Sequence, residues 1–124
     1  GSIPLFQGSK DVILVGANPK FFYEKPRNFW FFYGHRYNIY KQAKPHSGYT
    51  NSLRLIDNYF VYTSNVDGHY LRAGCNEDRI CECHGSILHN QCAECDLIFK
   101  VKYDGVRIDT KKHEAIELPK CPNC

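Results

Sequence analysis

Two C-x-x-C pairs constrain the fold of this chain more than any other feature of its sequence. Cys92 and Cys95 form the first pair, Cys121 and Cys124 form the second, and 25 residues separate them. Each pair can wrap a tetrahedral ion in a tight turn, and four thiolates leave no open position for water. The sequence therefore predicts a structural zinc ion that contributes to folding and not to catalysis.

The segment between the two pairs predicts a zinc ribbon. Residues 97–103 alternate like a strand, Asp104-Gly105 is a hairpin signal, and residues 106–109 resemble the return strand. His89 lies near the first pair, but four cysteines already satisfy a tetrahedral ion. The remaining cysteines are expected to be buried free thiols, and they are Cys75, Cys81 and Cys83.

Polar side chains follow a short apolar run at residues 59–63, which predicts a buried strand. Asn65 and Asp67 come just after this run, where open α/β sheets place ligand-binding groups. The alternative is an ordinary turn at Asp67-Gly68, with Asn65 bonded to its own backbone. Position alone does not decide between these interpretations.

A second strand-like run, residues 80–84, ends at His84 before Gly85. His84 is the candidate general base, because imidazole has the one side-chain pKa that ordinarily permits proton transfer near neutrality. A single histidine is more often structural, so this assignment depends on its neighbours. The other histidines are interpreted as surface or packing residues, namely His35, His46, His69, His89 and His113.

Three helices are predicted from spacing. The aromatic run 21–40 favours an amphipathic helix that ends before Pro45, with Lys41 and Lys44 in its last turn. The spacing is carried by Phe29, Phe32, Tyr33, Arg36, Tyr37 and Tyr40. Packing is favoured over base stacking, since few cations interleave with these rings. Residues 46–57 predict a second helix with Tyr49, Leu53 and Ile56 on one face, and residues 67–73 a short third one closed by Gly74.

Composition narrows the class of protein. The net charge is +3 without a basic block, which disfavours a nucleic-acid partner. Seven cysteines in this arrangement suit a reducing compartment. No apolar run approaches the roughly 18 residues needed to span a bilayer. We expect an intracellular protein, cytoplasmic or, in a eukaryote, nuclear, without a membrane partner.

The motifs together resemble those of the sirtuins, the NAD-dependent protein deacylases. The order T-S-N-V-D-G-H, A-G, E-C-H-G-S and two C-x-x-C pairs is similar to the family core, although Ser64 replaces the usual glutamine. The combination of T-S-N-V-D-G with E-C-H-G-S resembles a mostly bacterial branch of the family. The loop S-I-P-L-F-Q-G near the N-terminus is similar to the family's G-I-P-D-F-R-G, with Ser2, Leu5 and Gln7 at the departures.

The resemblance implies an α/β fold, part of a Rossmann-like sirtuin core. Residues 1–86 are expected to hold the NAD-binding part, with a helical insertion at about 20–57 that walls the acyl-substrate cleft, and residues 87–124 the zinc-ribbon subdomain. The 124 residues lack the family's G-A-G-x-S phosphate loop and the later strands of the sheet. We therefore expect a partial catalytic domain that is inactive alone, and Gly1-Ser2 could be a cloning scar.

The implied activity is removal of an acyl group from lysine, with release of nicotinamide and O-acyl-ADP-ribose. By resemblance, Asp67 holds the nicotinamide carboxamide, Asn65 orients ribose or water, and His84 is the base toward the ribose hydroxyls. Ser64 and Phe6 are expected at the cofactor, Phe6 as the aromatic that shields it. The expected partners are NAD⁺, Zn²⁺ and an acylated-lysine protein or peptide.

Two alternatives to deacylation remain open. The altered loop residues Leu5 and Gln7 admit a sirtuin-like NAD hydrolase or ADP-ribosyltransferase, because Gln7 replaces a cation that would meet the NAD phosphates. The missing sheet strands admit a non-enzymatic zinc-ribbon module for protein or nucleic-acid contacts.

Overall fold

The computed structural model describes residues 18–101 and 106–124. Among them, residues 18–39 with 106–124 form one compact unit and residues 40–101 form another. Two sequence predictions lie outside the described residues: the loop 2–8 with Phe6 and the turn at Asp104-Gly105.

Helices α2 (Lys20–Glu24) and α3 (Pro26–Gln42) replace the single aromatic helix predicted from spacing. The break comes at Pro26, whose fixed φ and missing N–H suit the first position of a helix. Helix α3 ends at Gln42 with Lys41 in its last turn, so Lys44 lies beyond it. The predicted burial of aromatics is confirmed, with Phe31, Phe32, Tyr37 and Tyr40 in the core.

Strands β5 (Ile108–Asp109) and β6 (Glu114–Ala115) form an antiparallel pair in the first unit. The turn between them is closed by the Asp109 carboxylate, which accepts the backbone N–H groups of Lys111 at 2.9 Å and Lys112 at 3.0 Å. These bonds, that of Lys112 foremost, lower the pKa of Asp109 below its usual value.

Side chains of α3 attach these strands to the helix. Arg27 donates to the carbonyl of Ala115 at 2.8 Å, and Ala115 is fully buried. Asn38 exchanges two hydrogen bonds with the backbone of Val106, at 2.8 and 2.6 Å. The helix comes so close at Gly34 that a Cβ there would lie 2.5 Å from Cγ1 of Val106.

The second unit begins with α4 (Ser47–Arg54) and continues through β1 (Val61–Thr63), α5 (His69–Arg72) and the short 3₁₀ helix η1 (Glu77–Arg79) to β2 (Ile80–Glu82). Strands β3 (His89–Gln91) and β4 (Ile98–Lys100) complete it. The predicted α4 face is shorter than expected, because Ile56 lies beyond the helix and is 59% exposed. Gly74, at φ +100°, follows α5 in the left-handed conformation that the sequence predicted.

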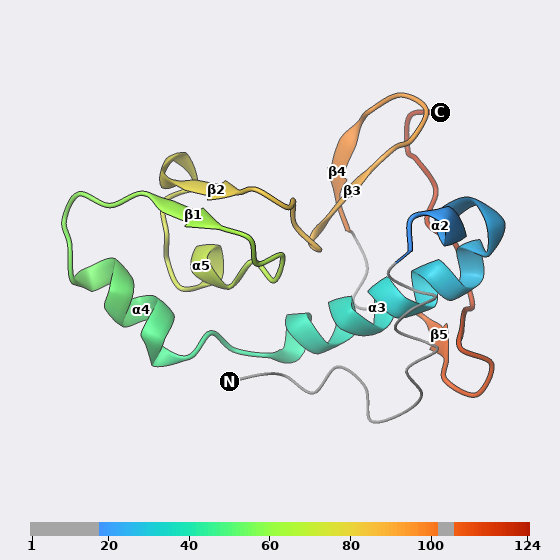
Figure 1. Ribbon diagram of the computed structural model, residues 1–124, viewed down its shortest axis with the longest axis horizontal. Coiled ribbons are helices and arrows are strands. Elements are labelled where there is room, and N and C mark those ends of the chain that lie inside the picture. The colour runs from blue at the N-terminus through green and yellow to red at the C-terminus, as the bar shows by residue number, and fades with distance from the viewer. Residues whose placement is uncertain (1–17, 102–105) are drawn as a thin grey trace. The chain divides into compact units, whose positions relative to one another are not determined.

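Strands β1 and β2 run parallel, with α5 in the connection between them (Figure 1). Val61 pairs with Ile80, Tyr62 with Cys81 and Thr63 with Glu82. Both strands predicted from the apolar runs at 59–63 and 80–84 are therefore confirmed, each at three residues. The predicted burial of the first strand is wrong, because Tyr62 is 73% exposed and its two neighbours in β1 are only half-buried. The parallel pairing places the ends of both strands at one edge.

The predicted pairing within the zinc ribbon is wrong. Strand β4 pairs with β3, His89 opposite Lys100, and β5 pairs with β6, so residues 106–109 are not the return strand of β4. The reason is local: the Cys92 N–H donates to the Leu97 carbonyl at 2.9 Å, which makes the first C-x-x-C pair itself the hairpin turn.

Candidate functional site

The predicted site residues follow the carboxyl ends of the parallel strands β1 and β2. Beyond the Thr63–Glu82 pair, the Cys83 N–H donates to the Thr63 carbonyl at 3.0 Å and extends the ladder. Asn65 lies two residues beyond β1 and His84 two residues beyond β2, in a turn that the Gly85 N–H closes by donating to the Glu82 carbonyl at 2.9 Å. Both residues are exposed. An amide and an imidazole thus meet solvent at the same edge, where a ligand can reach both. Ser64, also exposed, lies next to Asn65.

Asp67 is held more tightly than a residue in an ordinary loop. Its Oδ1 accepts the backbone N–H of His69 at 2.9 Å, and only 19% of its side chain is exposed. Gly68 has φ +69°, and a Cβ there would lie 2.6 Å from Cδ1 of Leu88. The turn at Asp67-Gly68 that the sequence offered as an alternative therefore exists, and it fixes the carboxylate beside the strand end. The backbone N–H of Asn65 donates to Oγ1 of Thr63 at 3.0 Å, and the Asn65 side chain forms a hydrogen bond with Tyr49.

Tyr49 of α4 is a site residue that the sequence did not reveal. Burial raises the pKa of its phenol above the usual value, and the nearby Asp67 carboxylate raises it further. Its hydroxyl lies within hydrogen-bonding reach of the Asn65 and Asp67 side chains. Helical spacing predicted only that Tyr49 would pack, since spacing gives the face of a residue and not the partner of its hydroxyl.

Glu82 adds a second carboxylate near this edge. Burial raises the pKa of its carboxyl above the ordinary value, and the Asp67 charge acts in the same direction, whereas His89 opposes it. The sequence offered no separate signal for Glu82 beyond its place in E-C-H-G-S. The site is consequently richer in acidic groups than the motif residues alone suggest.

The three leftover cysteines differ in burial. Cys75 is buried at 6% exposure, as predicted, and Cys81 is half-buried. Cys83 is exposed, so its predicted burial is wrong. Its thiol donates to the Thr63 carbonyl at 3.2 Å, and its hydrogen bond with Tyr62 raises the pKa of that phenol. Cys83 lies in the turn beyond the last residue of β2, whereas Cys81 lies within the strand.

The four predicted zinc cysteines form a cluster whose sulfur atoms all lie within 4.8 Å of one another. Backbone N–H groups point at the sulfurs, from Glu94 to Cys92 at 3.4 Å and from Asn123 to Cys121 at 3.3 Å. Donors on sulfur favour the thiolate, which is the form that binds metal. The donor set and its geometry fit a closed structural zinc site.

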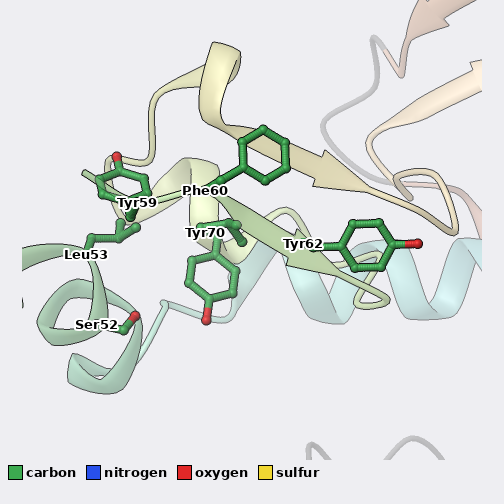
Figure 2. A pocket seen from close by; sticks show the side chains of 7 residues that line it. Ser52, Leu53, Tyr59, Phe60, Tyr62 and Tyr70 are labelled. Atoms are coloured by element: carbon green, nitrogen blue, oxygen red, sulfur yellow. The ribbon is translucent and has the colours of Figure 1, made fainter. Parts of the chain in front are cut away.

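A pocket of ≈ 260 Å³ lies beside β1 and not at its carboxyl end. Figure 2 shows its lining side chains, which come from α4, α5, β1 and the residues just before β1 and include Leu53, Tyr59 and Tyr70. None of the predicted site residues lines it. The pocket is therefore separate from the candidate site.

The Sir2 family model matches residues 10–124. The chain belongs to the Sir2 family. It is 33% identical over 111 residues to an NAD-dependent protein deacylase of Thermococcus sibiricus, covering 87% of this chain and 42% of that protein. It is 30% identical over 131 residues to an NAD-dependent protein deacylase of Leptospira interrogans, covering 98% of this chain and 49% of that protein.

Solved Sir2 structures share the fold. A Sir2 homologue crystallised with NAD superposes with a TM-score of 0.72 at 28% identity, over 88% of this chain and 40% of that one. A mutant Sir2 homologue in complex with 2′-O-acetyl ADP ribose gives a TM-score of 0.73 at 27% identity, over 100% of this chain and 46% of that one. The predicted α/β fold class, part of a Rossmann-like sirtuin core, is confirmed.

The chain spans less than half the length of these two curated relatives. Among the described residues, no helix combines the length and apolar character needed to cross a membrane.

Proposed function

We propose that the protein is an NAD-dependent protein deacylase, which removes an acyl group from lysine and releases nicotinamide and O-acyl-ADP-ribose. The observation that supports the proposal is the parallel pairing of β1 and β2, because Asn65 and Asp67 follow the end of one strand and His84 follows the end of the other. Catalysis by positioned groups requires such convergence, since a base must come within hydrogen-bonding reach of the proton it removes. The curated relatives named above carry the same activity in their names.

Each site residue has a role that suits its chemistry. The neutral imidazole of His84 can take a proton from a ribose hydroxyl, and its exposure leaves it open to substrate. The Asp67 carboxylate accepts the carboxamide N–H of nicotinamide, and its negative charge favours the cationic ring of the bound cofactor. Asn65 can donate to and accept from ribose or water through its amide. Bound NAD supplies the ribose carbon to which the acyl oxygen is transferred.

The remaining binding roles complete the proposal. Ser64 adjoins Asn65 on the cofactor side, and Phe6 is assigned the shielding aromatic by motif alone. The zinc ion would be held by Cys92, Cys95, Cys121 and Cys124, where it would supply a fixed tetrahedral cross-link and no open coordination position.

The proposal also covers the domain organisation, the partner and the location of the protein. Residues 1–86 make up the Rossmann-like part with the helical insertion, and residues 87–124 the ribbon. The partner is an acylated-lysine protein or peptide. We place the protein inside the cell, because paired C-x-x-C motifs retain zinc in a reducing compartment.

Product analysis tests the proposed function. The full-length protein is incubated with NAD and a panel of acylated peptides, and the products are separated by mass spectrometry. We expect nicotinamide and deacylated peptide in equal amounts, both dependent on NAD. Free ADP-ribose without deacylation would establish an NAD hydrolase instead, and ADP-ribose attached to protein would establish a transferase. Neither product together with no NAD binding would leave a zinc-ribbon binding module.

A further inference from the structure

His69 is the one buried polar residue among the core residues that the structure describes, with 6% of the residue exposed. Its Nδ1 is fully enclosed and has no hydrogen-bond partner within the described part of the chain. A buried nitrogen without a partner costs about 1–3 kcal/mol. A leucine or phenylalanine would fill the same space without that cost, so the imidazole needs a reason beyond packing.

The unpaired nitrogen faces the candidate site. Nδ1 of His69 lies 4.0 Å from Oδ1 of Asp67, slightly beyond hydrogen-bonding distance. The backbone N–H of His69 already donates to that same oxygen at 2.9 Å. The backbone of His69 thus holds Oδ1 of Asp67, and the ring nitrogen of the same residue lies just short of hydrogen-bonding that oxygen as well.

Aromatic rings hold the imidazole in this orientation. The Tyr49 ring packs edge-on against it, with centroids 5.6 Å apart, and the Tyr40 ring does the same at 6.4 Å. These contacts come from α4 and α3, so His69 is fixed from two helices. The groups that face it are two neutral phenols and the Asp67 carboxylate.

We propose that His69 is a positioning residue for Asp67, with a proton on Nδ1 that is donated to Oδ1 when the carboxylate binds the nicotinamide carboxamide. The proposal rests on the proposed function, because it takes the role of Asp67 from there. His69 touches neither cofactor nor substrate. It acts by fixing which carboxylate oxygen faces the ligand and by stabilising the charge of that carboxylate.

Two substitutions test the ring nitrogen of His69 and the packing of its ring separately. His69→Phe keeps an aromatic ring for the edge-on contacts with Tyr40 and Tyr49 but removes the donor. His69→Asn loses the ring, but its amide nitrogen can occupy the place of Nδ1. The full-length protein and both variants are compared by the dissociation constant of NAD from calorimetry and by Tm. The ¹⁵N spectrum of His69 in the parent protein reports which ring nitrogen carries the proton.

The proposal predicts opposite patterns for the two variants. His69→Phe should keep its Tm and bind NAD about tenfold more weakly, as expected for the loss of one hydrogen bond to a charged group. His69→Asn should lose Tm because of the cavity it leaves, yet bind NAD within about twofold of the parent protein. The ¹⁵N spectrum should show the proton on Nδ1.

Other results would overturn the proposal. NAD affinity that follows Tm in both variants would reduce His69 to a packing residue, as would unchanged affinity in His69→Phe or an unprotonated Nδ1. NAD binding without deacylation by the parent protein would overturn the proposed function and leave this inference standing. Absence of NAD binding by the parent protein would overturn both.

Discussion

The two parts of residues 40–101 that carry chemistry are held together in different ways. We call the carboxyl ends of β1 and β2, with Asn65, Asp67 and His84, the strand-pair site, and residues 89–100 the knuckle hairpin. The strand-pair site rests on buried groups, since His69 is 6% exposed and the Asp67 side chain 19%. In the knuckle hairpin, residues 93–98 are all exposed, with Ile98 at 63%.

This difference shows which part depends on a ligand for its stability. The hairpin buries too little apolar surface to be stable alone, because a two-stranded hairpin is at best marginally stable in water. Four thiolates on a metal can supply the missing free energy. The strand-pair site has helices packed on it and needs no ion. Zinc should therefore matter to the hairpin first and to the site only indirectly.

Loss of a zinc ligand should have the largest effect. Cys95→Ser should release the metal and lower the free energy of unfolding by on the order of 5 kcal/mol, since metal binding is part of the folding free energy. Zinc content and urea unfolding of the full-length protein measure this. Hydrogen exchange should quicken in β3 and β4 before it does in β1 and β2.

The control for this change is Cys83→Ser. Cys83 is exposed and lies outside the cysteine cluster, and a serine hydroxyl can still donate to the Thr63 carbonyl. Zinc content should stay at that of the parent protein. Full zinc retention in Cys95→Ser would refute the dependence of the hairpin on metal.

Gly68→Ala should have an intermediate effect on the strand-pair site. A residue with a Cβ in the left-handed conformation lowers the free energy of unfolding by about 1–2 kcal/mol. At Gly68 the added Cβ would also lie 2.6 Å from Cδ1 of Leu88. We expect a loss of about 2–3 kcal/mol in urea unfolding, together with weaker NAD binding because Asp67 adjoins the strained residue.

Gly74→Ala is the matched control for this strain. Gly74 is also left-handed, at φ +100°, but an added Cβ would meet nothing within 4 Å. Gly74→Ala should lower the free energy of unfolding only by the conformational strain, about 1–2 kcal/mol, and should bind NAD as tightly as the parent protein does. Equal losses in both variants would show that the Leu88 contact does not constrain the site.

The smallest predicted effect is the pH dependence due to Glu82. Burial raises the pKa of this carboxyl, so the folded state holds its proton more tightly than the unfolded state does. The protonated Glu82 carboxyl makes its full contribution to the free energy of unfolding below the ordinary pKa of a glutamate. This contribution is lost as the pH rises through the raised pKa of the folded protein. At neutral pH the charged Glu82 is therefore destabilising.

Glu82→Gln should remove this penalty. The gain at neutral pH should be less than about 1 kcal/mol, because the exposed part of the side chain is screened by solvent. Urea unfolding of both proteins across the acid range should show the gain disappearing as the pH falls. A gain that grows toward acid pH would have the wrong sign and would contradict the burial of this carboxyl.

Sequence reasoning succeeded where a residue's role follows from its neighbours in the chain. Strands at 59–63 and 80–84, the aromatic burial on α3 and the two C-x-x-C turns are all signalled by local spacing. The turn at Asp67-Gly68 was one of the two interpretations that the sequence left open, and glycine readily adopts the positive φ that it needs.

It failed where the partner is distant in sequence. The strand that pairs with β4 was misassigned, since alternation predicts a strand and not its neighbour. The hydroxyl of Tyr49 reaches the Asn65 and Asp67 side chains only after α4 has packed against α5. No periodicity in the chain encodes those contacts.

Turnover by His84→Ala in the full-length protein tests the central claim most directly. His84 is exposed, so its removal should leave Tm and NAD binding unchanged while NAD-dependent deacylation falls by at least about 100-fold. The exposed His113, which lies outside the site, provides the control, and His113→Ala should deacylate at the rate of the parent protein. Near-normal turnover by His84→Ala would contradict the assignment of His84 as the base and, with it, the strand-pair site as the catalytic centre.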